Sequence, residues 1–433
     1  MATDLMEAVR PVDSAALLGL LPGRPRVLGL GEPTHGEDAL LHMRDTLFRR
    51  LVEEEGYRTV ALETDCVRGL IVDDYVTGGP GTLDAVMEHG FSHGWGSSAA
   101  NRALVRWMRA RNEGLPAGRR VRFAGIDGPL EITGAASPRE SLTALHGYLA
   151  AHGDTGLLPC TAQALDRLLG ADERWTEPAA MTDPARSAGR SAPARELRLL
   201  AAELTALAET QAPHLIAATS RDAWERARLH GRAATGLLRY HHWMADTSPA
   251  RLTGLVGERD RIMAANLLAL AERGPVLVHA HNSHLQREKS SMRMGGAPLE
   301  WWSAGALVSL RLGERYAFAA TALGTIRHQG VDEPPPGTLE GLLYATAADR
   351  GVVDPARLAA ALGGTAGEVP GGALGGMPGE AAGGGLPGPR VSPWFGYAPL
   401  DPAHLASMDA VVFVRDVTRD QAVPDGDAAK RRT

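Results

Sequence analysis

Residues 27–36 read Val-Leu-Gly-Leu-Gly-Glu-Pro-Thr-His-Gly. An apolar run is followed at once by a carboxylate, Glu32, and an imidazole, His35, before a helical pattern begins. This order favours a strand, a turn and a helix, because glycine lets the backbone bend sharply and α/β proteins bind ligands at the carboxyl ends of parallel strands. Taken alone, the stretch fits a turn with a helix-capping Thr34 equally well.

Three further apolar runs end in polar side chains. Residues 58–63 end in an acid, residues 120–127 end in another, and residues 275–284 carry three imidazoles. If all four runs are parallel strands, their polar ends meet at one sheet edge and form a pocket with acid, base and electrophile candidates. The candidates are Glu32, His35, Glu63, Asp127, His279, His281 and His284.

At these positions the chain resembles the erythromycin esterase family. The resemblance covers roughly residues 25–325, and its central part, from about Ser137 to Ala250, matches only in helical character. The matching motifs agree in order and local spacing. They are GEPTHG at residues 31–36, Arg44, ALE at residues 61–63, ERDRIMAAN at residues 258–266 and HNSH at residues 281–284.

The resemblance implies that His35 activates a water molecule directly, with no acyl-enzyme intermediate. It also implies that Glu32 or Glu63 orients the imidazole. His281 and His284 would complete the pocket, either as donors to an oxyanion or as the acid that protonates the leaving alcohol.

Arg44 lies nine positions after His35 on the predicted helix. A guanidinium that folds back toward the sheet edge can bind a carboxylate or a tetrahedral oxyanion. The alternative is a surface residue paired with a helix neighbour. The resemblance favours the functional role.

The absence of several catalytic motifs limits the chemistry that the chain can perform. The chain has no Gly-x-Ser-x-Gly elbow, no recognisable nucleophile motif at Cys66 or Cys160, and no phosphate-binding glycine loop after a strand. The candidates that remain are acid–base reactions carried out by histidine and carboxylate side chains. A histidine with a pKa of about 6.5 takes a proton from water at neutral pH, which typically accelerates a reaction by about 10²- to 10⁴-fold.

We therefore expect an enzyme that hydrolyses an ester or lactone in a bulky, mostly apolar small molecule. A macrolide-type antibiotic is the substrate class that the family name suggests. A biosynthetic tailoring enzyme that performs elimination or cyclisation would use the same groups. A protein that only sequesters its ligand is a third possibility, against which the intact Glu32, His35 and Glu63 set argues.

A metal-dependent hydrolase is a rival reading of the same residues. His279 and His281 alternate on a strand and so point to one face, and Glu63 and Asp127 would complete a shell around a divalent cation. His279 is equally well a buried core residue, and no metal ligands are assigned. His93 and Trp95, in a glycine-rich stretch, are expected at the rim as substrate-binding residues or as a simple bend.

The predicted fold class is α/β, with a mainly parallel sheet flanked by helices and an inserted all-helical lobe. Residues 1–136 would form the first part of the core, residues 137–250 the lobe that covers the cleft, and residues 251–433 the remainder. Within the last part, residues 363–390 are rich in Gly and Pro and are expected to form an unstructured loop.

Composition excludes some partners. A net charge of −6 does not favour binding to nucleic acid, whose phosphates attract basic proteins. The apolar stretch from Ala15 to Leu21 is too short for a membrane span, and no basic segment precedes it as in a signal peptide. Two cysteines suit a reducing compartment, so a cytoplasmic location is expected. The oligomeric state stays open.

Overall fold

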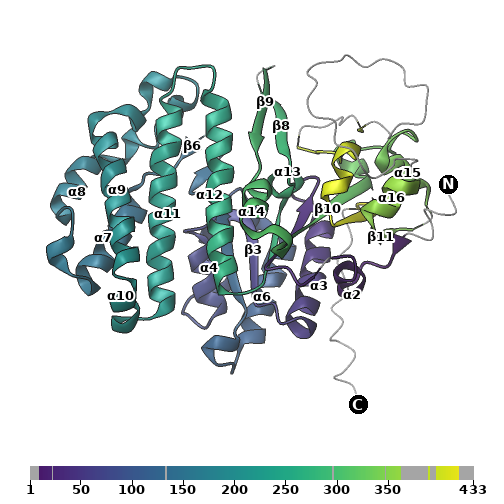
Figure 1. Cartoon of the computed structure of the whole chain (residues 1–433), viewed down its shortest axis with the longest axis horizontal. Helices are drawn as coiled ribbons and strands as arrows, with labels where there is room; N and C mark the ends of the chain where they lie inside the picture. Colours follow the sequence, from purple (N-terminus) through teal and green to yellow (C-terminus); the bar gives the residue numbers. More distant parts are fainter. Residues whose placement is uncertain are drawn as a thin grey trace.

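The computed structural model describes residues 9–21, 23–131, 134–294, 297–346, 348–361, 389–390 and 396–418. Its centre is an eight-stranded, mostly parallel sheet, which confirms the predicted fold class (Figure 1). The pairs β1–β11 and β11–β12 are antiparallel, so the sheet is mixed at one edge. In order across the sheet, the strands are β1 (Val9–Arg10), β11 (Arg350–Val353), β12 (Ala410–Asp416), β10 (Tyr316–Thr325), β2 (Val27–Glu32), β7 (Val276–His281), β3 (Thr59–Asp65) and β4 (Arg122–Asp127).

Helices cover both faces of the sheet, and each face has its own apolar core. One face packs against α2 (Ser14–Leu18), α3 (Asp38–Glu54), α4 (Gly69–Val76), α5 (Leu83–His89) and α6 (Ala99–Asn112). The other packs against α12 (Arg251–Arg273), α13 (Asn282–Leu285), α14 (Ala304–Leu312), α15 (Leu339–Ala345) and α16 (Pro355–Ala361).

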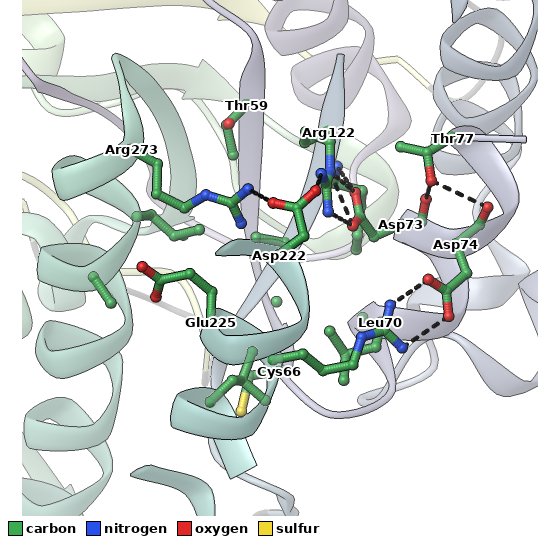
Figure 2. A pocket seen from close by; sticks show the side chains of 18 of the residues that line it. Thr59, Cys66, Leu70, Asp73, Asp74, Thr77, Arg122, Asp222, Glu225 and Arg273 are labelled. Atoms are coloured by element: carbon green, nitrogen blue, oxygen red, sulfur yellow. Dashed lines mark hydrogen bonds and ion pairs between the residues drawn. The ribbon is translucent and has the colours of Figure 1, made fainter. Parts of the chain in front are cut away.

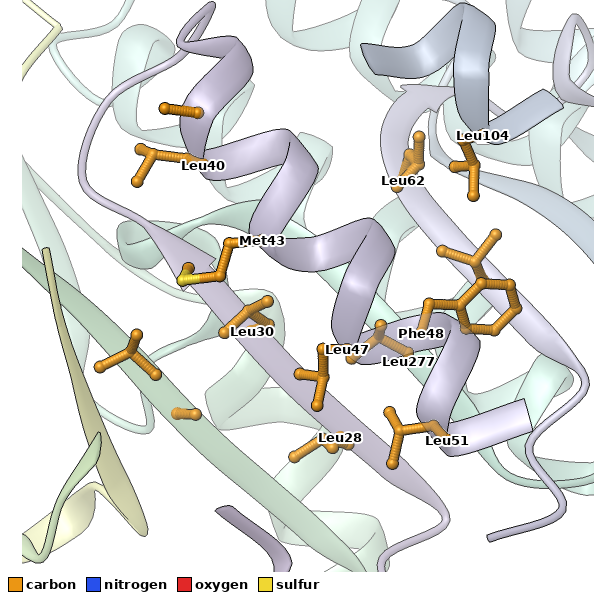
Figure 3. Packing of buried hydrophobic residues seen from close by; sticks show 14 of the residues in the cluster. Leu28, Leu30, Leu40, Met43, Leu47, Phe48, Leu51, Leu62, Leu104 and Leu277 are labelled. Atoms are coloured by element: carbon orange, nitrogen blue, oxygen red, sulfur yellow. The ribbon is translucent and has the colours of Figure 1, made fainter. Parts of the chain in front are cut away.

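The first crossover shows how sequence sets this packing. Along α3 the apolar residues recur every three or four positions, so they form one stripe that lies on the sheet (Figure 3). The helix ends before Gly56, whose φ of 73° is a conformation that glycine adopts without strain. Burying each large apolar side chain stabilises the fold by about 1.5–3 kcal/mol. The stripe consists of Leu40, Met43, Leu47, Phe48 and Leu51, packed over Leu28 and Leu30 of β2.

The predicted helical region is present as α7 (Arg139–His152), α8 (Ala162–Leu169), α9 (Ala192–Thr210), α10 (Ala212–Ala218) and α11 (Arg221–Met244). These helices, which we call the lobe, have an apolar core of their own and lie beside the sheet domain (Figure 1). Helix α12 contacts both α11 and the edge strand β4, and thereby ties the lobe to the sheet.

Two short hairpins complete the described fold: β5 (Leu130–Glu131) pairs with β6 (Gly134–Ala135), and β8 (Lys289–Met294) pairs with β9 (Ala297–Trp302). The predicted loop at residues 363–390 lies outside the described residues except for its last two. Of these, Arg390 is buried and donates to the carbonyl oxygens of Leu323 and Gly324, so it belongs to the packed core. Among the described residues, no helix combines the length and apolarity that a membrane crossing requires.

Candidate active site

Strand order brings the predicted residues together. The strands β2, β7, β3 and β4 are consecutive neighbours in the sheet, so their carboxyl ends form one edge. In the register of these strands Glu32 lies opposite His281, and Leu62, which precedes Glu63, lies opposite His279. Asp127 ends the next strand, β4.

Glu32 holds two histidines at once. Its Oε1 lies 2.7 Å from Nδ1 of His35, and its Oε2 lies 3.0 Å from Nε2 of His279. Burial by itself would raise the pKa of this carboxyl, but the charge and hydrogen bonds of His279 and His35 outweigh it and lower the pKa to about 2. Glu32 is therefore ionised and accepts from both rings.

His35 is the exposed member of the cluster, with 40% of its side chain accessible. Its Nε2 lies 3.6 Å from Oε1 of Glu63. The ring meets that of Trp95 edge to face, with the centroids 5.1 Å apart. Burial would lower the pKa of His35, but the Glu63 and Glu32 carboxylates outweigh it and raise the pKa above 6.5. An imidazole held between two carboxylates is well placed to accept a proton, because both stabilise its charged form.

Glu63 connects His35 to a cation. Its Oε1 accepts from Nη2 of Arg259 at 2.8 Å, and its Oε2 accepts from the backbone N–H of His281 at 2.8 Å. Burial would raise the pKa of Glu63, yet His284, His35 and Arg259 hold it well below its usual range. The side chain of Glu63 is 5% exposed, so its charge is compensated inside the protein.

Asp127 fixes the same arginine. Nε and Nη2 of Arg259 lie 2.9 and 2.7 Å from Oδ2 of Asp127, a fork geometry that orients the guanidinium. The same oxygen lies 3.0 Å from Nε2 of His93. His93 has a φ of 55°, an unfavourable conformation for a residue with a Cβ, and such strain is concentrated at functional sites.

His284 carries a positive charge in this arrangement. Its Nδ1 lies 2.6 Å from Asp260 Oδ1, and its Nε2 lies 3.4 Å from Glu63 Oε1. Although burial opposes the charge, Asp260 and Glu63 raise the pKa of His284 to about 10. Asp260 is in turn held by the N–H groups of Trp301 and Ala304, each at 3.0 Å from Oδ2.

His279 and His281 have protein partners at every ring nitrogen. His279 contacts the carbonyl oxygen of Leu30 as well as Glu32. Nδ1 of His281 accepts from the backbone N–H of Ser283, so its proton is on Nε2, which donates to the carbonyl oxygen of Pro33 at 3.2 Å. Burial, together with His35, lowers the pKa of His281 to about 4, and the ring is neutral.

These contacts bear on the metal alternative. In the described part of the chain, no group of three or more His, Cys, Asp or Glu side chains is arranged to hold a metal ion. Coordination through His279 and His281 would require both rings to give up the hydrogen bonds described above.

Arg44 departs from the predicted arrangement. Its side chain is 1% exposed, and it donates to Asp45 Oδ1 through Nε at 2.8 Å and Nη2 at 2.6 Å. Nη2 also lies 3.0 Å from Asn101 Oδ1, and Asn101 donates to the carbonyl oxygen of Trp95. Arg44 is therefore neither a surface residue nor open to a ligand in this conformation. Through Asn101, Arg44 helps to hold Trp95 in place.

A cavity of about 580 Å³ opens onto His35 and Glu63. Most of its lining side chains are polar or charged, and Trp95 is its one large apolar side chain among the described residues. Trp95 is anchored by its indole N–H, which donates to the carbonyl oxygen of Glu63 at 2.9 Å. The other lining residues are Gly36, Asp38, His93, Gly94, Ser97, Ser98 and Arg259.

Sequence reasoning did not select two of the residues that complete the cluster. Arg259 takes the place at the cavity that was expected for Arg44, and Asp260 holds His284. Both lie in the ERDRIMAAN stretch, which is one of the motifs that match the family. The motif alone does not indicate which of its side chains turn toward the sheet edge.

Comparisons with known proteins agree with this architecture. Residues 52–417 match the model of the family described as Erythromycin esterase, a range that includes Glu63, Arg259 and His284 and begins after His35. A solved Bacillus cereus protein, 19% identical, has a TM-score of 0.67 over 96% of this chain and 97% of its own.

Two further solved structures share the fold. A succinoglycan biosynthesis protein is 15% identical, with a TM-score of 0.60 over 96% of each chain. A mutant of the erythromycin esterase EreC, in its open conformation, is 16% identical, with a TM-score of 0.61 over 94% of each chain. At these identities the structural matches establish the common fold, and the family follows from the match over most of the chain. The protein belongs to the erythromycin esterase family.

Proposed function

We propose that the protein hydrolyses an ester or lactone with a water molecule activated by His35, without a serine or cysteine nucleophile. The observation that carries this proposal is the position of His35, held between Glu32 and Glu63 at the mouth of the cavity. Family membership supports the reaction class.

The proton path follows from the tautomer. The Nδ1–H of His35 donates to ionised Glu32, so its Nε2 is the atom that faces Glu63 and the cavity. A water molecule beside Nε2 can transfer its proton there as it attacks the carbonyl carbon. The two carboxylates then stabilise the imidazolium that forms, because opposite charges attract strongly in a partly buried site.

Arg259 and His284 supply the positive charge for the oxyanion. Arg259 lines the cavity, and its Nη1 lies 3.4 Å from Nε2 of His284. Because their carboxylate partners fix both groups, little reorganisation is needed when the carbonyl oxygen becomes negative. On collapse of the tetrahedral intermediate, His35 returns the proton to the leaving alkoxide, and the products are a carboxylic acid and an alcohol.

The substrate class is also a proposal. The polar and charged side chains of the lining favour a molecule with oxygen atoms near the reacting carbonyl, as in a hydroxylated macrocyclic lactone. The matched EreC is an erythromycin esterase, which supports lactone cleavage. The matched succinoglycan protein is named for biosynthesis, so a tailoring reaction, elimination or cyclisation, is the second candidate.

The test is incubation of purified protein with macrolide lactones and simple esters, followed by mass spectrometry of the small molecules. Hydrolysis adds one water, and His35→Ala abolishes this gain. His89→Ala is the matched control, because His89 is 63% exposed and does not line the cavity. A chelator should leave the rate unchanged, and loss of activity with the chelator would favour the metal alternative.

A further inference from the structure

A second cavity, of about 640 Å³, lies where the lobe meets the sheet domain (Figure 2). Its walls come from α4, β4, α11 and α12, and it shares no lining residue with the cavity at His35. Helix α11 belongs to the lobe, whereas α4 and β4 belong to the sheet domain. Anything bound here would therefore contact both parts of the molecule.

Most charges around this cavity are neutralised by ion pairs. Arg122 lies between Asp73, at 2.5 Å, and Asp222, at 2.9 Å, and Asp222 also pairs with Arg273 (Figure 2). Arg226 of α11 pairs with Asp74 of α4. These ion pairs link the lobe to the sheet domain, and they compensate the charges of Arg122, Arg226 and Arg273.

Two more arginines of the lining are occupied by backbone oxygens. Arg58 donates to the carbonyl oxygen of Gly118, and Arg120 donates to those of Leu115 and Thr77. Arg58 is exposed, so its charge is also screened by solvent.

Arg232 differs from the other arginines of the lining. Its Nε donates to Asn266 Oδ1 at 2.9 Å, and within the described residues its two terminal nitrogens have neither a hydrogen bond nor an ion pair. Burial lowers the pKa of Arg232, and the nearby charge of Arg228 acts in the same direction, whereas Cys66, Glu225 and Glu272 act against it. Within the described residues no carboxylate forms a direct ion pair with Arg232, so its terminal nitrogens are available to an anion in the cavity.

Part of the cavity wall is apolar. Leu70 of α4, Leu229 of α11, and Ala269 and Leu270 of α12 line the cavity. Cys66, whose side chain is buried, lines it as well. A guanidinium whose terminal nitrogens are unoccupied, in a cavity with aliphatic side chains, matches a molecule with an anionic head and a hydrocarbon body.

We propose that this cavity is a second binding site, for a small amphiphilic carboxylate whose head group pairs with Arg232 and whose hydrocarbon body lies on Leu70, Leu229 and Leu270. A singly charged head group fits better than a phosphate dianion, because Asp73, Asp74, Asp222 and Glu225 also line the cavity and repel a second negative charge.

The experiment is isothermal titration calorimetry of the full chain with octanoate, octanol, acetate and octyl phosphate. Octanoate should bind, and each of the other three should bind at least about tenfold more weakly, because octanol lacks the charge, acetate lacks the body and octyl phosphate is repelled. Arg232→Gln should weaken octanoate at least about tenfold, the usual effect of losing a charged hydrogen bond. Circular dichroism shows whether each variant is folded.

Two variants locate the site. Arg167→Gln, at an exposed position on α8, removes the same charge far from the cavity and should bind octanoate like the original protein. Leu229→Trp fills the apolar part without changing charge and should abolish binding even if Arg232→Gln fails to fold. The proposal is overturned if octanoate does not bind, if it binds Arg232→Gln or Leu229→Trp unchanged, or if octyl phosphate binds as tightly.

Discussion

The interactions of Glu32 allow one prediction to be worked out in numbers. Replacing Glu32 with glutamine keeps the shape but removes the charge that holds His35 and His279. The carboxyl is buried, and its pKa is lowered from 4.5 to about 2. At 1.36 kcal/mol per pH unit, this corresponds to roughly 3 kcal/mol of folding free energy at neutral pH. The glutamine amide also presents a donor to one of the rings, which adds to the cost.

The sign of the pH dependence is fixed by the lowered pKa. A carboxyl whose pKa is lower in the folded state stabilises the protein fully above the unfolded value of 4.5, and this contribution is lost as the pH falls toward 2. The difference in unfolding free energy between the original protein and Glu32→Gln should therefore be largest at pH 7 and should shrink between pH 4.5 and pH 2.

Urea unfolding followed by circular dichroism measures this difference. Glu37→Gln is the matched control, since Glu37 is also buried but contacts His328 and lies outside the cluster. A cost for Glu32→Gln below about 0.5 kcal/mol at pH 7, or a cost that stays constant down to pH 3, would refute the reasoning from charge pairing.

Three further predictions test other parts of the site. Arg44→Lys should lower the free energy of unfolding by about 1–3 kcal/mol, because one ammonium cannot replace the hydrogen bonds of the guanidinium to Asp45 and Asn101. The same substitution should leave KM nearly unchanged. A large change in KM at unchanged stability would instead support a ligand-binding role for Arg44. The value of kcat/KM should rise with pH as His35, whose pKa is raised, loses its proton, and it should fall near pH 10 as His284 loses its proton. Glu63→Gln should move the rising limb of this pH profile to lower pH, because it removes a charge that raises the pKa of His35. A profile in which the rising limb stays in place contradicts the assignment of His35 as the base. Gly31→Ala should destabilise by about 1–3 kcal/mol and displace Glu32, because the new Cβ would lie 2.1 Å from Asn282 Oδ1, whereas Gly29→Ala, whose nearest contact is 3.2 Å, should cost less in the same urea unfolding assay.

The sequence predicted the architecture where the local pattern was strong. Each apolar run that ends in an acid or a histidine is a strand of the sheet, because burial on both faces demands continuous apolar residues. The antiparallel edge was not predicted. Strand β1 spans two residues and β11 four, which is too short for a periodic pattern, and both depend on pairing with distant parts of the chain.

The placement of the candidate site's residues was predictable to the same degree. Residues at strand ends, such as Glu32 and Glu63, were found because strand direction alone places them at the sheet edge. Arg259 sits on a helix, and its partners Glu63 and Asp127 lie 196 and 132 positions away in the sequence. Tertiary packing decides which way such a side chain points. The same packing buried Arg44 against Asn101, 57 positions away, a contact that no local pattern indicates.

The central claim is direct attack of water on the substrate carbonyl with His35 as the base. The most direct measurement is a rapid-quench single turnover in ¹⁸O-labelled water, with mass spectra of both the product and the intact protein. The account predicts one labelled oxygen in the carboxyl group of the product, no mass added to the protein at any time, and no turnover by His35→Ala. A covalent adduct on the protein, or a product that has lost water or gained no labelled oxygen, would contradict it.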